Sequence, residues 1–372
     1  MRIALLTNFV PPYRLPLYRA LRERAGELRV LASTGMEADR SWAPAWGDLD
    51  VILQRTLTLR RTWRHERFHE RYEQHVPWDT LPQLARWRPD AVISAEFGAR
   101  SLQALLYARA ARIPALLWAT GVDHLETDRG AFRRLARRAL LRAADGVLVN
   151  GAGGARYIRG LGFPDAAIHR VPYAIELGPF TALPATRPPD AARRLLYTGS
   201  LSERKGVDVL LRGVAEWGRR YPAERLHLTI VGQGPAEARL RALELPANVA
   251  VAWAGAVAYD ALPSWYAGAG LAIFPTLGDE WGLVVQEAMA AGVPVIGSVW
   301  AQAVDELVRD GANGWRFRPD DPGAVADVLA RALATPDAEL AEMRHTARAT
   351  ARRITPELMA GRIMAAFDEA MK

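Results

Sequence analysis

Residues Phe274 to Gly297 read FPTLGDEWGLVVQEAMAAGVPVIG and contain the strongest indication of the fold in this chain. The apolar run 271–274 is typical of a buried strand, and the Pro- and Gly-containing loop after it leads into a helix that begins near Gly282. The run 292–297 is typical of a tight turn into a second buried parallel strand. Strand, helix and parallel strand in this order predict a βαβ unit.

Two carboxylates flank the start of this expected helix. Asp279 precedes it, and Glu287 lies about one and a half turns inside it. The unpaired N–H groups of a helix N-terminus favour a phosphate, here near Trp281, Gly282 and Leu283. A helix cap and a solvated side chain are the commoner roles of such acids, and the spacing alone does not exclude them. The pattern fits an anionic, hydroxyl-rich ligand such as a sugar nucleotide.

The stretch resembles the signature of the retaining glycosyltransferases of family 4, which have the GT-B fold. Their pattern is E-G-F-G-L-V-x-x-E-A-M-A-x-G-x-P-V, and this chain has Asp279 where the family usually has Glu and Glu280 where it has Gly. Asp279 keeps the negative charge but has a shorter reach. The resemblance implies that Asp279 holds hydroxyls of the transferred sugar and that Glu287 holds the ribose of a nucleotide.

A second loop resembles the family's phosphate-binding loop, G-R-L-x-x-x-K-G, whose Arg and Lys hold the phosphates of the donor. Lys205 is one of only two lysines among 48 basic residues, and it precedes the helix expected over 207–218. A compact ammonium reaches a diphosphate from a crowded loop better than a planar guanidinium does. Ser200 stands at the Arg position. Arg204 either supplies the missing charge or points to water.

A third loop follows the strand expected over 226–231 and contains Gly232 and Gly234. Missing side chains let the backbone approach a flat ligand, although a lone G-x-G is more often only a turn. In this order it resembles the family's G-x-G-P loop near the nucleotide base, and the run 304–314 resembles the family's architectural closing stretch. The resemblance implies a catalytic set of Lys205, Asp279 and Glu287 and a donor-binding set of Gly199, Ser200, Arg204, Lys205, Gly232, Gly234, Trp281, Gly282, Leu283 and Glu287.

The rest of the chain alternates apolar runs with helical patterns, which predicts parallel sheets built from βαβ units. Strands are expected at 3–6, 28–32, 91–94, 115–119, 146–150, 194–198, 226–231, 249–252, 271–274 and 293–296, with a linker at 178–189. We therefore expect an α/β protein of GT-B fold, with two Rossmann-like βαβ domains facing an interdomain cleft. They are an N-terminal acceptor-binding domain (1–180), a C-terminal nucleotide-sugar-binding domain (181–354) and a helix (355–372) that can cross back to the first domain.

Polar residues follow three strands of the N-terminal half and are candidates for the acceptor side. Two adjacent prolines remove amide donors from the first of these loops, so it is poorly suited to cradle a phosphate. Its Arg14 either holds the acceptor or is an exposed loop residue. The family often has a His where this chain has Thr120, so no catalytic His is assigned. The acceptor-side candidates are Asn8, Tyr13, Arg14, Glu96, Thr120, Asp123 and His124.

Composition places the chain among ordinary globular proteins. Its 372 residues suit two domains, 50% of them are hydrophobic and 24% charged, and none is Cys. Neither a membrane helix nor a signal peptide is evident, so we expect a cytoplasmic enzyme. The absence of Cys and of a His pair at ligand spacing predicts that no metal and no cofactor is needed.

The formal net charge of +7 is concentrated in two arginine-rich stretches with aromatic or leucine neighbours, at 60–72 and 132–142. Such stretches can lie on an anionic membrane, placing the enzyme at its inner face, or can hold an acidic acceptor, but more often they are solvated helix faces. No nucleic-acid recognition motif accompanies the charge, so no nucleic-acid partner is expected.

The expected function is retaining transfer of a sugar from a nucleoside-diphosphate sugar to a hydroxyl acceptor, which is a glycan, a lipid-linked sugar or a small natural product. Two alternatives remain. One is a nucleotide-sugar 2-epimerase or phosphorylase of the same fold, and the other is a non-catalytic protein that binds sugar nucleotides.

Overall fold

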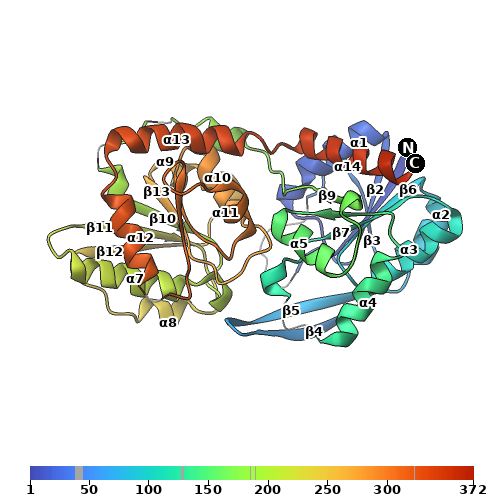
Figure 1. The fold of residues 1–372 in the computed structure, drawn as a ribbon, viewed down its shortest axis with the longest axis horizontal. Coiled ribbons are helices and arrows are strands. Elements are labelled where there is room, and N and C mark those ends of the chain that lie inside the picture. Colours follow the sequence, from blue (N-terminus) through green and yellow to red (C-terminus); the bar gives the residue numbers. More distant parts are fainter. Residues whose placement is uncertain (38–44, 127–129, 185, 189, 322) are drawn as a thin grey trace. The chain divides into compact units, whose positions relative to one another are not determined.

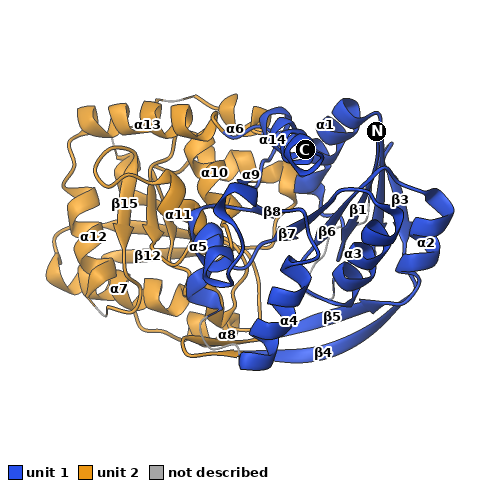
Figure 2. Cartoon of the chain, turned by 45° about the vertical axis from the view of Figure 1, so that its right-hand side comes forward, with its two compact units in different colours: residues 1–63, 71–176, 354–372 blue, residues 64–70, 177–353 orange. Residues whose placement is uncertain are grey.

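The computed structural model describes residues 1–37, 45–126, 130–184, 186–188, 190–321 and 323–372 (Figure 1). By their contacts these residues form two compact units (Figure 2). The first consists of Met1–Trp63, Arg71–Glu176 and Ile354–Lys372, and the second of Arg64–Glu70 and Leu177–Arg353. None of the helices in the described ranges is long and apolar enough to cross a membrane.

The first unit is built on a seven-stranded sheet of order β3-β2-β1-β6-β7-β8-β9, in which all neighbours are parallel. Its strands are β1 (Arg2–Thr7), β2 (Glu27–Ala32), β3 (Asp50–Leu53), β6 (Ala91–Ala95), β7 (Ala115–Ala119), β8 (Gly146–Val149) and β9 (Ile168–Arg170). Its helices are α1 (Leu15–Ala25), α2 (Thr80–Trp87), α3 (Ala99–Ala111), α4 (Ala131–Leu141), α5 (Ala152–Gly160) and α14 (Pro356–Ala370), with short 3-10 turns at Pro12–Arg14, Asp123–Leu125 and Asp165–Ala167.

Helix α14 comes from the last segment of the chain and packs against α1 and the neighbouring strands β7, β8 and β9. Its buried residues include Met359, Ile363 and Phe367. Thr355 caps its first turn by accepting a hydrogen bond from the Leu358 amide. The first unit is therefore completed by residues more than 170 positions beyond its main part, which ends at Glu176.

The arginine-rich stretch at 60–72 forms a two-stranded sheet of its own, with β4 (Thr56–His65) and β5 (Phe68–Pro77). Most of its side chains are exposed. The turn and the adjoining ends of the strands, Arg64–Glu70, group with the second unit. The interpretation of residues 60–72 as a solvated helix face is therefore wrong. No strand was predicted here, because charged residues interrupt any alternation of apolar and polar positions.

The second unit has a six-stranded parallel sheet of order β12-β11-β10-β13-β14-β15. Its strands are β10 (Arg194–Thr198), β11 (Leu226–Val231), β12 (Val249–Gly255), β13 (Leu271–Phe274), β14 (Val295–Ser298) and β15 (Gly314–Phe317). Its helices are α6 (Gly178–Thr181), α7 (Val207–Arg220), α8 (Glu237–Arg241), α9 (Leu262–Ala267), α10 (Leu283–Ala290), α11 (Gln302–Leu307), α12 (Ala324–Leu333) and α13 (Asp337–Ala351), with 3-10 turns at Ala191–Arg193, Glu203–Lys205 and Tyr259–Ala261.

Several expected boundaries in this unit need correction. Strand β12 continues to Gly255, beyond the expected end at 252, and strand β14 ends at Ser298 and not at 296. Strand β14 begins at Val295 and not at residue 293, because Gly292 turns the chain with a φ of +72° and Pro294 has no N–H for the ladder. The expected linker 178–189 contains the short helix α6, while its residues 185 and 189 lie outside the described ranges.

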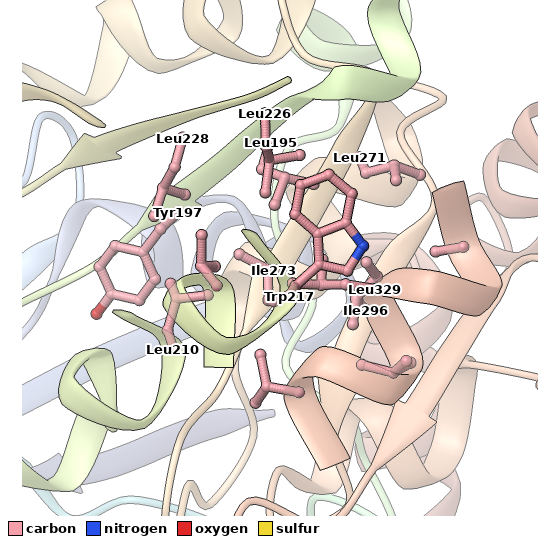
Figure 3. Packing of buried hydrophobic residues seen from close by; sticks show 14 of the residues in the cluster. Leu195, Tyr197, Leu210, Trp217, Leu226, Leu228, Leu271, Ile273, Ile296 and Leu329 are labelled. Carbon is pink, nitrogen blue, oxygen red and sulfur yellow. The ribbon is translucent and has the colours of Figure 1, made fainter. Parts of the chain in front are cut away.

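The core of the second unit lies between one face of its sheet and helices α7 and α12 (Figure 3). Trp217 of α7 is buried in one cluster with Leu195 and Leu271 of the sheet and Leu329 of α12. Burying a large aromatic side chain of this kind is worth about 2–3 kcal/mol. This packing fixes the adjacent strands β10 and β13, whose carboxyl ends carry the loops described next.

Candidate functional site

In the second unit, the loops that follow β10 and β13 bring a lysine, an arginine and an aspartate together. Lys205 ends the 3-10 turn after β10, and its Nζ forms an ion pair with Oδ2 of Asp279 in the loop after β13. Nη1 of Arg204 lies 3.8 Å from the same oxygen. The loops are also tied by their backbones, since the Leu277 amide donates to the Arg204 carbonyl over 2.8 Å. The structure thus places two cations around one carboxylate.

Asp279 is ionised in this environment. Burial alone would raise its pKa, but the charges of Lys205 and Arg204 outweigh burial and lower the pKa overall. Its other oxygen, Oδ1, accepts the backbone N–H of Trp281 over 3.2 Å. The Trp281 amide, expected to face a phosphate, is therefore already used within the protein.

Arg204 points into this cluster and not to water, which resolves the alternative left by the sequence. Its Nε atom donates to Oε2 of Glu70 over 2.6 Å, and its Nη1 atom donates to the Gly278 carbonyl over 3.1 Å. Glu70 was not among the residues proposed from the sequence. It lies 134 positions from Arg204, and no local pattern connects the two.

Ser200, at the position where the family usually has Arg, has an exposed side chain. Its carbonyl accepts the hydroxyl of Tyr197 over 2.8 Å. The glycines around it are required by the packing of two loops on each other. A Cβ atom on Gly232 would lie 1.8 Å from the Gly199 carbonyl oxygen, and both residues have φ values near +145° (+144° and +147°).

A neighbouring backbone segment also requires glycine at position 234, because a Cβ atom on Gly234 would lie 2.6 Å from the Leu201 carbonyl oxygen. In the structure these glycines therefore make room for neighbouring backbone.

Glu287 lies on α10 with only 3% of its surface exposed. Its Oε2 atom accepts the hydroxyl of Tyr266 over 3.0 Å, and that hydroxyl lies 2.8 Å from Oγ1 of Thr198 at the end of β10. Burial raises the pKa of Glu287 to about 7, although hydrogen bonds with Tyr266 and Tyr259 oppose the shift. The commoner role of a solvated side chain therefore does not apply to Glu287. Tyr266 and Thr198 were not predicted.

The start of α10 is shaped by the three residues that the sequence analysis selected there. Gly282 precedes the helix with a φ of +102°, and Leu283 is its first residue and is half-buried. Trp281 is buried, and its indole N–H donates to Oε1 of Gln286 over 2.8 Å. Trp281 therefore anchors the loop.

In the first unit, Asn8, Glu96 and Thr120 directly follow the carboxyl ends of three adjacent strands, β1, β6 and β7. The Thr120 hydroxyl donates to Oε1 of Glu96 over 2.7 Å. Oδ1 of Asn8 accepts from Nη1 of Arg100 over 2.9 Å. Arg100 is buried and was not predicted, although a buried Arg at the start of α3 has to find acceptors.

Arg14 is buried, so the alternative of an exposed loop residue is wrong. Its guanidinium carbon lies 3.6 Å from the ring centre of Tyr173 and 4.5 Å from that of Trp118. Tyr13 contacts the same Tyr173 ring edge-on, with 6.4 Å between the ring centres. The two prolines before Tyr13 open a 3-10 turn that points these side chains inward.

Asp123 and His124 form a separate local group. Oδ2 of Asp123 lies 2.6 Å from Nε of Arg156, and its Oδ1 atom accepts the His124 amide over 2.9 Å. Burial would raise the pKa of Asp123, but the hydrogen bonds from His124 and Arg156 lower it to about 2.

Across the described ranges, no group of three or more His, Asp or Glu side chains is arranged to hold a metal ion.

The chain has two parallel, Rossmann-like sheets, which is the architecture of the GT-B class of glycosyltransferases. In the second unit, Asp279 precedes helix α10 and Glu287 is buried within that helix. The family model for the glycosyl transferase 4-like domain matches residues 10–174, and the model for glycosyl transferases group 1 matches residues 192–335. The chain belongs to the family-4 type of glycosyltransferases.

Curated relatives support this membership. The chain is 30% identical over 260 residues to a D-inositol 3-phosphate glycosyltransferase of Nocardioides sp., a match that covers 60% of this chain and 56% of the relative. It is 31% identical over 224 residues to a protein of the same name from Acidothermus cellulolyticus, covering 54% and 48%. The chain thus spans about half the length of the curated relatives it matches.

Solved structures share the fold over nearly all of the chain. A complex of Anabaena HepE with UDP superposes with a TM-score of 0.72 at 16% identity, covering 99% of this chain and 100% of the other. Sucrose-phosphate synthase from Thermosynechococcus elongatus superposes with a TM-score of 0.67 at 19% identity, covering 100% and 99%. Both confirm the GT-B fold and, at these identities, the fold alone.

Proposed function

We propose that this chain is a retaining glycosyltransferase that moves a sugar from a nucleoside-diphosphate sugar to a hydroxyl acceptor without a bound metal. The observation that carries the proposal is the cluster of Lys205, Arg204 and Asp279 at the start of α10, with Glu287 buried in the same helix. Cations near a helix N-terminus suit a diphosphate leaving group, and the carboxylates suit hydroxyls of a sugar and a ribose.

Each member of the cluster has a role in this proposal. Lys205 and Arg204 stabilise the negative charge that develops on the diphosphate, an effect worth several powers of ten in rate in comparable sites. Asp279 accepts hydroxyls of the transferred sugar, and Glu287, held by Tyr266, accepts those of the ribose. In the described structure Arg204 is paired with Glu70 and Lys205 with Asp279. A diphosphate that binds here replaces these carboxylates as the partner of the two cations.

UDP is the first nucleotide to test. The HepE structures contain UDP or UDP-glucose, and they share the fold of this chain over nearly its whole length. We propose a UDP-sugar as donor on this ground. A thermal-shift series with UDP-, GDP-, ADP- and TDP-sugars ranks the bases, because a ligand at a hundred times its Kd stabilises the folded state by about 2.7 kcal/mol.

One incubation separates this function from its alternatives. Labelled nucleotide sugar is mixed with the protein, with and without a set of hydroxyl acceptors. A transferase gives a labelled glycoside only when acceptor is present, and retention gives the same anomeric configuration in donor and product. A 2-epimerase changes the sugar without acceptor, a phosphorylase requires phosphate, and a binding protein converts nothing. Inverted configuration or acceptor-independent conversion contradicts the proposal.

We also propose peripheral contact with an anionic membrane through α4. Phe132 and Leu135 on this helix are 85% and 61% exposed, and Arg133, Arg134 and Arg138 beside them are exposed cations. Apolar side chains flanked by arginine match the chemistry of a lipid surface. Flotation with vesicles containing anionic lipid tests the contact. Phe132→Ser with Leu135→Ser should abolish flotation, and equal binding by the double variant contradicts it.

A further inference from the structure

We propose that Glu96 binds the acceptor and that it holds an uncharged hydroxyl of a sugar or polyol. This inference rests on the proposed transfer reaction and adds the chemical class of its acceptor. Glu96 is the first residue after β6, at the carboxyl end of the first unit's parallel sheet. Ligands of open parallel sheets bind at this end of the strands.

The backbone of Glu96 is strained. Its φ is +65°, in the left-handed region that disfavours residues with a Cβ atom. Among the described residues, Arg88 and Arg112 are the other non-glycine positions with positive φ, and each is the C-cap of a helix, where this conformation is common. Glu96 caps no helix, since α3 begins at Ala99. Strain of this kind concentrates at binding and catalytic positions.

The surrounding contacts hold Glu96 in this conformation. Its N–H donates to the Trp118 carbonyl over 2.9 Å, and its own carbonyl accepts the hydroxyl of the buried Ser101. Nη2 of Arg100 donates to the preceding carbonyl, that of Ala95, over 2.9 Å. The direction of the Glu96 side chain is therefore set before a ligand arrives, which lowers the entropy lost on binding.

The chemistry around the carboxyl group favours a neutral hydroxyl over a phosphate. The group accepts one hydrogen bond, from Thr120, and no ion pair with it is found among the described residues. The nearby Arg100 donates through Nη1 and Nη2 to Asn8, Ser33 and the Ala95 carbonyl, and its buried Nε atom has no hydrogen-bond partner among the described residues. Burial raises the pKa of Glu96, against the Thr120 hydrogen bond and the charge of Arg100. In its ionised form this carboxyl group repels a phosphate, and in either protonation state it pairs with a hydroxyl.

The test uses Glu96→Gln, Glu96→Gly and the control Arg112→Gly. Transfer from a UDP-sugar is measured to methyl glycosides, as uncharged acceptors, and to hexose phosphates, and Tm is recorded with and without UDP. We expect Glu96→Gly and Arg112→Gly to raise Tm by about 1–3 °C each, because both remove left-handed strain. We expect Glu96→Gly to lose about tenfold or more in kcat/KM for the glycosides, as when a hydrogen bond to the substrate is lost, and Glu96→Gln to lose less, because its amide still pairs with a hydroxyl. Arg112→Gly keeps the parent value.

Two further measurements separate this inference from the proposed function. Acceptor-independent release of UDP and the UDP-induced rise in Tm should be the same in all variants, since they report the donor site alone. If the parent protein shows neither, the proposed function fails. If it shows both but transfers only to hexose phosphates, or to neither set, the acceptor class is overturned. Unchanged acceptor KM in both Glu96 variants overturns the role of Glu96.

Discussion

Nε of Arg204 lies 2.6 Å from a carboxylate oxygen of Glu70, and Nη1 of the same guanidinium lies 3.8 Å from Asp279. Burial would lower the pKa of Arg204, but the two carboxylates raise it overall. Glu280 adds a weaker effect of the same sign. Arg204 and Lys205 are thus already paired with carboxylates, and a diphosphate binds them by displacing one of these carboxylates.

Glu70→Gln should tighten the binding of UDP by about threefold to tenfold, because it removes one negative charge beside the cations. The unliganded protein should become less stable, since a mostly buried arginine loses its partner. Calorimetric titration measures the first effect and urea unfolding the second. Glu73→Gln is the matched control, because Glu73 lies on the same strand and pairs with the exposed Arg60 at 3.6 Å. Weaker UDP binding in Glu70→Gln would show that Glu70 orients Arg204 for the ligand.

Lys205→Ala should lower kcat for transfer by about a hundredfold to a thousandfold while the protein remains folded, because the ammonium stabilises the leaving group. Turnover and far-UV circular dichroism are the measurements. Arg212→Ala serves as the control, since Arg212 is a 67% exposed cation on α7, seven positions further along the chain. Turnover equal to the parent in Lys205→Ala would remove Lys205 from the site.

The free energy of unfolding should depend on pH through Glu287. Its folded pKa of about 7 lies above the ordinary value of 4.5, so between these limits the folded chain keeps a proton that the unfolded chain has lost. Stability from this group is therefore present below pH 4.5, falls as pH rises to 7 and is absent above. The full effect is about 3 kcal/mol at 1.36 kcal/mol per pKa unit.

Urea unfolding of the unliganded protein at pH 5 and pH 8 checks this dependence. Glu287→Gln should remove most of the difference between the two pH values, and it should also weaken UDP binding, because one acceptor of the ribose hydroxyls is lost. The exposed Glu244→Gln is the control and should follow the parent. A parent protein equally stable at both pH values, or a Glu287→Gln protein that binds UDP normally, contradicts the assignment.

Transfer should continue at full rate in excess EDTA, because Lys205 and Arg204 supply positive charge for the diphosphate. The prediction depends on whether these two cations suffice, because Ser200 stands where related enzymes usually have an arginine. The assay compares initial rates in EDTA, Mg²⁺ and Mn²⁺. Activity that disappears in EDTA and returns with either ion would show that a metal fills the place of the missing guanidinium.

The buried strands could be predicted closely from the sequence. The expected ranges 115–119, 194–198, 226–231 and 271–274 coincide with β7, β10, β11 and β13. Strands covered on both faces are continuous apolar runs, and Gly, Pro or polar residues end them. The short edge strands β3, β9 and β15 were not predicted, because none of them contains four consecutive apolar residues.

The partners within the site could not be predicted in the same way. Lys205, Asp279 and Glu287 were selected by local motifs, whereas Glu70 and Tyr266 reach them from distant segments. A long-range contact leaves no periodic trace in either segment. Arg14 illustrates the same limit, because its burial depends on Tyr173, which lies 159 positions further along the chain.

Ile354–Lys372 belongs to the first unit, and α14 packs against α1 near the start of the chain. During translation the ribosome therefore makes all of the second unit before it makes the final helix of the first. Until then, the surface of α1 that α14 covers has no partner. The unit whose synthesis begins first is thus the one whose synthesis ends last, and a nascent chain that ends at Arg353 contains every residue of the second unit but lacks α14 of the first.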